Sequence, residues 1–292
     1  MEKIGIIGLG LMGTSLALAL KKYLPAIMIA GSDQSQQHLD FNLANQTINQ
    51  QLTNDNLGQM ELIFLATPVH SIIPVLGQLR DKINRSKTIV TDLGSTKEEI
   101  CRSVKKLYPE LMFIGGHPMT GKENSGPGAA EADLFVDKNY ILTTGAEPII
   151  EQKLTPLLKK IGARIVFLDP AEHDHMVAIT SHLPQLLATA LINQLFEYKE
   201  YSPQSQALIG PGFLGLTRIA ASNPRMWTDI YRSNRVNLLK TIDQMVTILQ
   251  QYRKEIQADD EEAIYDFMTR GRKRRLELKG EDSNGLADQT TS

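Results

Sequence analysis

The chain has 292 residues, of which 42% are hydrophobic and 22% are charged, and its formal net charge is −2. This length predicts one or two domains, and the near-neutral charge provides no general attraction to nucleic acid or membranes. Cys101 is the single cysteine, which excludes an intrachain disulfide and favours a cytoplasmic protein. We find neither a secretion signal nor a run of about 18 uninterrupted apolar residues, so we expect no membrane-spanning helix.

Short runs rich in β-forming residues alternate with amphipathic stretches in the first part of the chain. The runs that we predict as strands are Lys3–Gly8, Ala26–Gly31, Leu62–Thr67, Thr88–Asp92, Phe113–Gly116, Tyr140–Thr144 and Ala163–Leu168. Helices are predicted between several of them, as at Gly13–Tyr23 and Lys97–Leu107. This alternation indicates an α/β domain with a parallel sheet covered by helices, because parallel neighbours need crossover connections.

A glycine-rich loop connects the first strand to the first helix. Gly8 suits a tight turn, Gly10 lets the backbone approach a pyrophosphate, and Gly13 allows close helix–strand packing. The N-terminus of the helix offers free N–H groups to phosphates. The motif therefore predicts a Rossmann-type dinucleotide site whose loop residues are Gly8, Gly10, Leu11, Met12 and Gly13.

Asp33, at the end of the second strand, indicates which dinucleotide binds. A carboxylate there accepts hydrogen bonds from a ribose 2′-hydroxyl and repels a 2′-phosphate, and neither Gln34 nor Ser35 supplies a cation. We therefore predict NAD rather than NADP. Thr67 and Pro68, at the end of the third strand, face the same edge of the sheet and complete the predicted cofactor site.

Ser95 and His117 follow predicted strands, where ligand-facing residues belong. Ser95 has two possible roles, which can coexist: a site residue, or the N-cap of the helix Lys97–Leu107 with Glu98 completing a capping box. His117 stands between paired glycines and Pro118, so we predict it on a rigid loop with a functional role.

The pattern becomes helical after Asp169-Pro170. Glu172–Tyr198, Pro224–Gln257 and Asp259–Lys273 have helical spacing and almost no strand signal. We predict a dinucleotide-binding domain at residues 1–169, an all-helical substrate and dimerisation domain at 170–279, and a disordered polar tail at 280–292. His173 and His175 cannot share a helix face, so we expect no metal site there.

An apolar stripe follows the predicted helix Pro224–Gln257. Its residues are Leu238, Ile242, Met245, Leu249, Tyr252 and Ile256. The stripe either packs within the helical domain or forms part of a dimer interface. The basic run from Arg270 to Arg275 is expected to be a solvated helix end, since cations suit helix C-termini.

Several segments together resemble the prephenate/arogenate dehydrogenase family. They are Asp92–Lys97, Gly115–Gly126, Glu172–Asp174, Ser181–Pro184 and Thr217–Pro224, and they occur in the family's order. The resemblance extends from Lys3 to about Arg235. It implies conversion of prephenate to 4-hydroxyphenylpyruvate with NAD in tyrosine biosynthesis, and a C-terminal domain similar to that of 6-phosphogluconate dehydrogenase. The apolar stripe of the helical half leads us to expect a homodimer.

The resemblance also implies roles for individual residues. His117 accepts the hydrogen bond of the substrate hydroxyl, Ser95 orients that hydroxyl or the histidine, and Arg218 binds a substrate carboxylate. Glu123, His182 and Gln185 belong to the substrate site by the same resemblance, and His182 is either buried structure or support for other site residues.

Three departures from the family pattern bear on these expectations. Gln185 stands where some prephenate-specific members have a histidine, which leaves the choice between prephenate and arogenate open. Gly212–Leu216 replaces a segment that has an Arg-Asp pair in many relatives. We expect no room for the regulatory ACT domain that some relatives carry.

Two other functions compete with this interpretation. The β-hydroxyacid dehydrogenases share the glycine loop but use a lysine on the first long helix of the second domain, and Glu172–Phe196 contains no lysine. A non-catalytic NAD-binding sensor would not need His117, Ser95 and Arg218 together.

Overall fold

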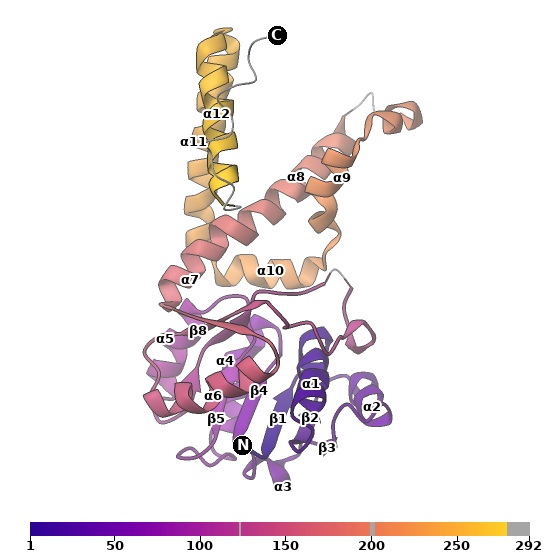
Figure 1. Ribbon diagram of the computed structural model, residues 1–292, viewed down its shortest axis with the longest axis vertical. Helices are drawn as coiled ribbons and strands as arrows, with labels where there is room; N and C mark the ends of the chain where they lie inside the picture. The colour runs from indigo at the N-terminus through magenta and orange to yellow at the C-terminus, as the bar shows by residue number, and fades with distance from the viewer. Residues whose placement is uncertain (123, 199–201, 279–292) are drawn as a thin grey trace. The chain divides into compact units, whose positions relative to one another are not determined.

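The computed structural model describes residues 1–122, 124–198 and 202–278, so Glu123 and the predicted tail at 280–292 lie outside the described residues. The chain forms two compact units, Met1–Leu238 and Leu239–Ser292 (Figure 1).

A parallel six-stranded sheet is the centre of the first unit, with strand order β3-β2-β1-β4-β5-β6. The strands are β1 (Lys3–Ile7), β2 (Met28–Ser32), β3 (Gln50–Gln51), β4 (Leu62–Leu65), β5 (Ile89–Asp92) and β6 (Met112–Ile114). Residues of β1, β4 and β5 are almost all buried, as expected for parallel strands covered on both faces. The predicted α/β class with a parallel sheet is confirmed, and β3 was not predicted.

A second sheet contains three strands, β7 (Gly116–Pro118), β8 (Asn139–Thr143) and β9 (Arg164–Leu168). The prediction that the strands near Tyr140 and Arg164 continue the parallel sheet is wrong, because these strands belong to the separate three-stranded sheet. In it, β7 pairs antiparallel with β8, and β8 pairs parallel with β9. His117 pairs with Ile141 in this sheet, so it lies on a strand and not on the predicted loop.

Helices cover both faces of the main sheet. They are α1 (Leu11–Tyr23), α2 (Gln36–Ala44), α3 (Asn54–Leu57), α4 (Val69–Leu79), α5 (Glu98–Leu107) and α6 (Pro148–Lys160). Apolar residues of α1 and α6 pack into one core, and those of α4 and α5 into another. This doubly wound arrangement brings the carboxyl ends of the strands to one edge, where ligands bind in such sheets.

One continuous helical stretch, Pro170–Glu197, follows the second sheet. It comprises α7 (Pro170–Val177), a π turn η2 (Ala178–His182) and α8 (Leu183–Glu197). Pro184 explains the π turn, because proline lacks an N–H and its ring clashes with the carbonyl one turn earlier. Figure 1 shows α7 and α8 as one long helix, with α9 (Pro211–Thr217) against α8.

The stretch Pro170–Glu197 is long and apolar enough to cross a membrane by length and composition alone. However, it carries buried polar side chains, among them Asp174 and His182, that make hydrogen bonds within the unit. It also packs against α5, α9 and the short 3-10 helix η4 (Arg218–Ala221). We therefore interpret it as a helix of the folded domain.

The predicted helix Pro224–Gln257 is broken at Asn234 into α10 (Pro224–Ser233) and α11 (Arg235–Gln257). At the break, the Asn234 side chain donates a hydrogen bond to the Asp174 carbonyl oxygen at 2.7 Å, which ties this point of the chain to α7. The 3-10 helices η1 (Pro127–Ala129) and η3 (Pro203–Leu208) complete the first unit.

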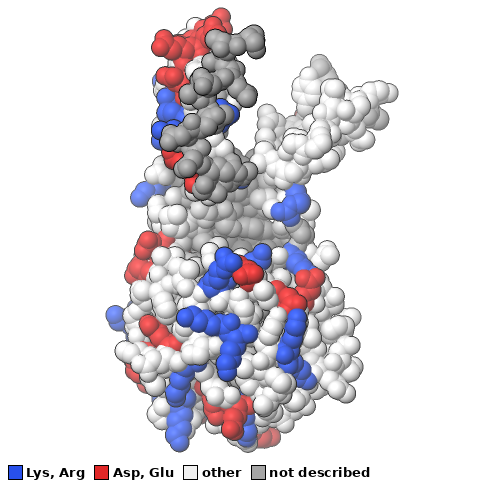
Figure 2. All heavy atoms as spheres, in the orientation of Figure 1, with Lys and Arg blue, Asp and Glu red and all other residues white. Residues whose placement is uncertain are grey.

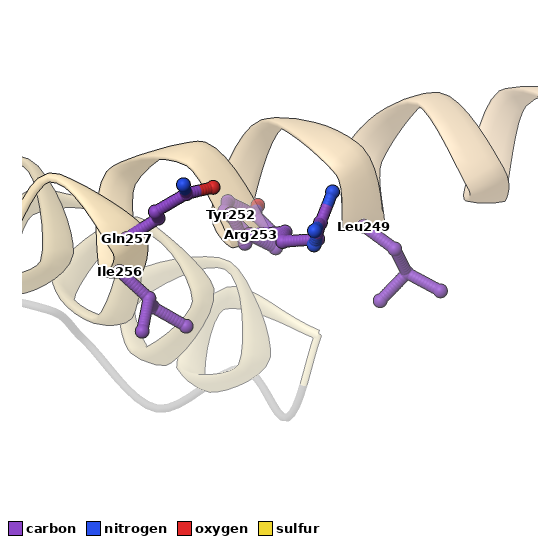
Figure 3. A pocket seen from close by; sticks show the side chains of 5 residues that line it. All are labelled: Leu249, Tyr252, Arg253, Ile256 and Gln257. Atoms are coloured by element: carbon purple, nitrogen blue, oxygen red, sulfur yellow. The ribbon is translucent and has the colours of Figure 1, made fainter.

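The second unit contains most of α11 and the helix α12 (Glu261–Glu277). Tyr252 and Phe267 hold the two helices together, with ring centroids 3.3 Å apart. Figure 3 shows an open pocket on α11, lined by Leu249, Tyr252, Arg253, Ile256 and Gln257. Leu249 and Ile256 of the predicted stripe are 54% and 65% exposed, so packing within the described chain does not cover them. The basic run lies exposed near the end of α12, as predicted.

Candidate active site

Each glycine of the loop between β1 and α1 has a distinct environment. Gly8 has a φ of 96°, and a Cβ atom on it would lie 2.5 Å from the Ala66 carbonyl oxygen. A Cβ atom on Gly13 would overlap the Gly8 carbonyl oxygen, whereas one on Gly10 would meet nothing within 4 Å. The backbone turns sharply at Gly8, packs closely at Gly13 and faces open space at Gly10, as a dinucleotide loop requires.

Helix α1 begins beside this open space, at Leu11 rather than at the predicted Gly13. Its N-cap, Gly10, provides no side-chain hydrogen bond. The first backbone N–H groups of a helix have no partner within the helix, so those of Leu11 and Met12 can receive an anion.

Asp33, directly after β2, points its carboxylate at the glycine loop. Its Oδ2 accepts a hydrogen bond from the Leu9 backbone N–H at 2.6 Å, and its Oδ1 accepts one from the Ser35 N–H at 2.8 Å. The His38 Nδ1 lies 3.5 Å from the same carboxylate, a neighbour that the sequence did not suggest. A carboxylate has further lone pairs, so Asp33 can hold the loop and still accept a ribose hydroxyl.

Thr67 and Pro68 lie at the end of β4, beside Ala66 against which Gly8 packs. The Thr67 Oγ1 is buried without a hydrogen-bond partner among the described residues. An unsatisfied buried hydroxyl, the open space at Gly10 and the Asp33 carboxylate all suit a bound dinucleotide. These residues would hold the dinucleotide, and the Asp33 carboxylate suits NAD.

A chain of hydrogen bonds links His117 to helix α7. The His117 Nδ1 lies 2.8 Å from the His173 Nε2, and the two rings meet edge to face at 74°. The His173 Nδ1 lies 2.7 Å from Oδ1 of Asp174. Both His173 and Asp174 are 1% exposed, so these contacts are made out of water.

Asp174 connects this chain to the first turn of α5. Its Oδ1 accepts the Lys97 backbone N–H at 2.7 Å, and its Oδ2 accepts the Glu98 N–H at 2.9 Å. The helix begins at Glu98, and its N-cap residue, Lys97, makes no side-chain capping bond. Of the two roles left open for Ser95, the N-cap role is therefore wrong, because a carboxylate from α7 takes that place.

A buried ion pair lies near His117. Lys97 Nζ contacts the Asp92 carboxylate, and neither side chain is exposed. Asp92 also accepts the Gly94 N–H at 2.8 Å and the Gly116 N–H at 3.2 Å. Ser95 and His117 each follow one of these glycines, so a single carboxylate fixes the backbone immediately before both residues.

Burial holds the pKa of the His117 imidazole well below its usual value, and the neighbouring His173 and Lys97 lower it further. The imidazole is consequently neutral near pH 7. A neutral imidazole has one nitrogen with a free lone pair and can accept a hydrogen bond or a proton from a hydroxyl.

His182 lies in the π turn and is 1% exposed. Its Nδ1 lies 3.3 Å from the Asn234 Nδ2, and its ring meets Trp227 of α10 edge to face. Burial lowers the pKa of His182 to about 4. The Trp227 Nε1 is buried without a hydrogen-bond partner among the described residues.

The remaining predicted substrate residues lie on the helices of the first unit. Gln185 is one turn after His182 on α8, is 4% exposed, and its Oε1 is buried with no partner among the described residues. Arg218 is the first residue of η4, which packs against α8. Ser95 is partly exposed between β5 and α5, and Glu123 lies outside the described residues.

Sequence reasoning missed the supporting residues of His117. His173 and Asp174 lie in a predicted helix and in a segment that resembles the family, but neither they nor Asn234, Asp92 and Lys97 were given a role at the site. One signal could have found them: adjacent histidine and aspartate in the first turns of a helix have polar atoms that must find partners when buried.

Comparison with known proteins assigns both halves of the chain to one family. Residues 16–167 match the model for the nucleotide-binding domain of prephenate dehydrogenase, and residues 169–270 match that for its dimerization domain. The prephenate dehydrogenase of Lactococcus lactis is 36% identical over 284 residues, which are 96% of this chain and 78% of that protein.

Two solved structures are similar over nearly their whole length. Prephenate dehydrogenase from A. aeolicus, in complex with hydroxyphenyl propionate and NAD+, has a TM-score of 0.87 and 26% identity, covering 95% of this chain and 98% of that one. Arogenate dehydrogenase from Synechocystis has a TM-score of 0.82 and 30% identity, covering 94% and 99%. With both domain models matched in order and these likenesses in sequence and structure, the chain belongs to the prephenate dehydrogenase family.

Proposed function

We propose that this chain catalyses the oxidative decarboxylation of prephenate to 4-hydroxyphenylpyruvate, with NAD as the acceptor of hydride, in tyrosine biosynthesis. The observation that carries the proposal is His117, a neutral imidazole whose Nδ1 is engaged by His173, which leaves Nε2 for a substrate hydroxyl. Family membership and the NAD-bound relative support the same reaction.

Prephenate has a hydroxyl on one ring carbon and a carboxylate on the opposite carbon. Bound NAD supplies the acceptor for the hydride of the hydroxyl-bearing carbon. As carbon dioxide leaves from the other side, the ring becomes aromatic, which makes the step strongly favourable. His117 assists by drawing the hydroxyl proton toward Nε2, since an oxygen with more negative charge expels hydride more readily. The proton returns to the oxygen in the product, so the reaction releases none.

The other roles are assigned by chemistry and by position. Arg218 binds a substrate carboxylate, for which its planar guanidinium is suited. Ser95 orients the substrate hydroxyl or the His117 ring. Asp33 selects NAD by accepting the ribose hydroxyl. His182 supports the site through its contact with Asn234, and Glu123 is retained only by family resemblance.

Arogenate is the second candidate substrate, and one observation favours it. The buried Oε1 of Gln185 is an acceptor without a partner among the described residues, and arogenate carries an ammonium group where prephenate has a keto oxygen. Prephenate offers no donor at that position.

The test supplies each substrate separately and follows the absorbance of NADH. Prephenate should be oxidised with the higher kcat/KM, and replacement of His117 by Asn should remove most of the rate. His70→Asn is the matched control, because His70 is exposed and paired with Asp229. The proposal fails if neither substrate yields NADH, and arogenate takes the place of prephenate if it alone reacts.

We also propose that the chain forms a homodimer through its helical part, with residues 1–169 binding the cofactor and residues 170–279 supplying the interface. The segment from Ser202 to Thr217 has no charged residue and forms the uncharged arm in Figure 2. Leu208, Leu214 and Leu216 there are 87%, 59% and 62% exposed, and such a surface suits a second subunit. A monomer by light scattering at micromolar concentration would contradict this.

We propose a cytoplasmic location for this enzyme.

A further inference from the structure

His117 lies at one end of a chain of hydrogen bonds. They run from His117 through His173 and Asp174 to the backbone N–H groups that begin α5, with consecutive separations of 2.8, 2.7 and 2.7 Å. These residues come from β7, α7 and the start of α5, so the chain joins three elements that are distant in sequence.

The direction of each hydrogen bond follows from the anchored end. The backbone N–H groups of Lys97 and Glu98 can only donate, so Asp174 accepts from them. A carboxylate has no hydrogen of its own to give, so the His173 Nδ1 that faces it carries one. A neutral His173 then has a bare Nε2, and the His117 Nδ1 opposite must donate.

We propose that His173 and Asp174 are positioning residues that fix the tautomer and ring orientation of His117, so that its bare Nε2 faces the substrate. This inference rests on the proposed function for its catalytic consequence, whereas the tautomer belongs to the protein alone. When the Nε2 takes the hydroxyl proton, the positive charge that forms on His117 strengthens its hydrogen bond to His173.

The opposite arrangement has a clear cost. If the His117 Nδ1 were bare, the Nε2 would carry hydrogen and could only donate to the substrate hydroxyl, which opposes removal of its proton. His173 would then need hydrogens on both nitrogens, so the buried site would have to hold a charged imidazolium. The opposite tautomer would therefore be both unable to accept the substrate proton and costly to bury.

Two replacements of His173 separate positioning from packing. The amide of glutamine reaches the position of Nε2, so His173→Gln keeps an acceptor for His117 and loses the donor to Asp174. The amide of asparagine reaches only the position of Nδ1, so His173→Asn keeps that donor and leaves His117 without an acceptor. A purely structural role predicts that His173→Asn is the milder change, because it keeps Asp174 satisfied.

We expect the reverse in turnover. The kcat of His173→Asn should fall on the order of tenfold or more, with the KM values for NAD and substrate within about twofold, whereas His173→Gln should keep most of its kcat. His70→Asn, at an exposed histidine, serves as the matched control. A kcat for His173→Asn equal to or above that of His173→Gln overturns the proposal, provided that circular dichroism shows both to be folded.

The tautomer itself is read by NMR of the full chain labelled with nitrogen-15 in histidine. The signals of His117 are those that disappear in His117→Asn. The wild type should show hydrogen on Nδ1 and none on Nε2, and His173→Asn should show a mixture. Hydrogen on the His117 Nε2 in the wild type overturns the proposal. Because this measurement needs no substrate, its result is independent of whether prephenate is the substrate.

Discussion

The Asp174 carboxylate caps helix α5 from a distance of 77 residues in the sequence, with the Lys97 backbone N–H 2.7 Å from Oδ1. The positive end of the α5 dipole thus faces the same carboxylate that holds His173. One side chain therefore stabilises helix α5 and fixes the histidine pair. Substitutions of different residues at this site should consequently affect either the stability of the protein or its activity.

Replacement of Ser95 should lower activity without lowering stability. Because Ser95 does not cap α5, Ser95→Ala should change the free energy of unfolding by less than about 0.5 kcal/mol. Its kcat/KM should nevertheless fall by roughly tenfold, from the loss of one hydrogen bond to the substrate hydroxyl. Urea unfolding and steady-state rates measure the two quantities, and a large loss of stability with normal rates would restore the capping role.

Asp174→Ala should show a large loss of stability. It removes the cap of α5 and leaves the buried His173 Nδ1 without a partner, for a combined cost of about 2–4 kcal/mol. Asp169→Ala is the matched control, because Asp169 caps α7 from an exposed position and should cost about 0.5–2 kcal/mol. Equal losses in the two variants would mean that burial adds nothing to the Asp174 contacts.

Asp33 should determine the choice of cofactor. Wild-type enzyme should use NAD much better than NADP, because the carboxylate accepts the ribose hydroxyl and repels a phosphate. Replacement of Asp33 by serine with a nearby arginine should erase or reverse the preference. Asp33→Asn is a useful second variant, since its amide oxygen can still accept the Leu9 N–H and hold the loop. A wild type that prefers NADP would contradict this role.

Buried His182 predicts a loss of stability in mild acid. Its pKa is about 4 in the folded chain, where burial disfavours the charged form, and about 6.5 when unfolded. The unfolded chain therefore binds the proton first as pH falls, so the stabilisation present above pH 6.5 is lost progressively down to about pH 4, by about 3 kcal/mol. Urea unfolding at several pH values should show a shallower loss in His182→Gln, and identical slopes would exclude His182 as the cause.

Much of the fold was predictable because its determinants are local. The apolar strands β1, β4 and β5 and the glycine loop each show their pattern within a few residues. Strand β3 was missed because Gln50–Gln51 is polar and short, and its pairing depends on the neighbouring β2. The second sheet was missed because a Gly-His-Pro strand has no β-forming pattern and depends on its pairing with β8.

The parts of the site that depend on local sequence were also predictable, and the parts that depend on distant contacts were not. Gly8, Gly13 and Asp33 have roles that follow from the turn and the strand end beside them. The contact between His117 on β7 and His173 on α7 spans 56 residues and depends on the tertiary fold, so no local pattern indicates it. The sequence suggested Ser95 as one possible cap of α5 for the same reason, since a serine close in sequence can be seen there and a carboxylate from another helix cannot.

The final prediction separates His117 from Arg218. His117 acts as charge develops on the substrate hydroxyl, so its interaction is strongest in the transition state. His117→Asn should lower kcat by on the order of 10²–10⁴ with little change in KM, the range for a lost general base. Arg218 binds a carboxylate present in ground and transition states alike, so Arg218→Gln should chiefly raise KM, by roughly one to two orders of magnitude.

Circular dichroism must show both variants folded, because an arginine also serves packing. Near-normal turnover of His117→Asn on prephenate and on arogenate would remove His117 from the chemistry. If Arg218→Gln lowers kcat at constant KM, its contact forms only in the transition state, and Arg218 would then act on the departing carboxylate rather than anchor the substrate.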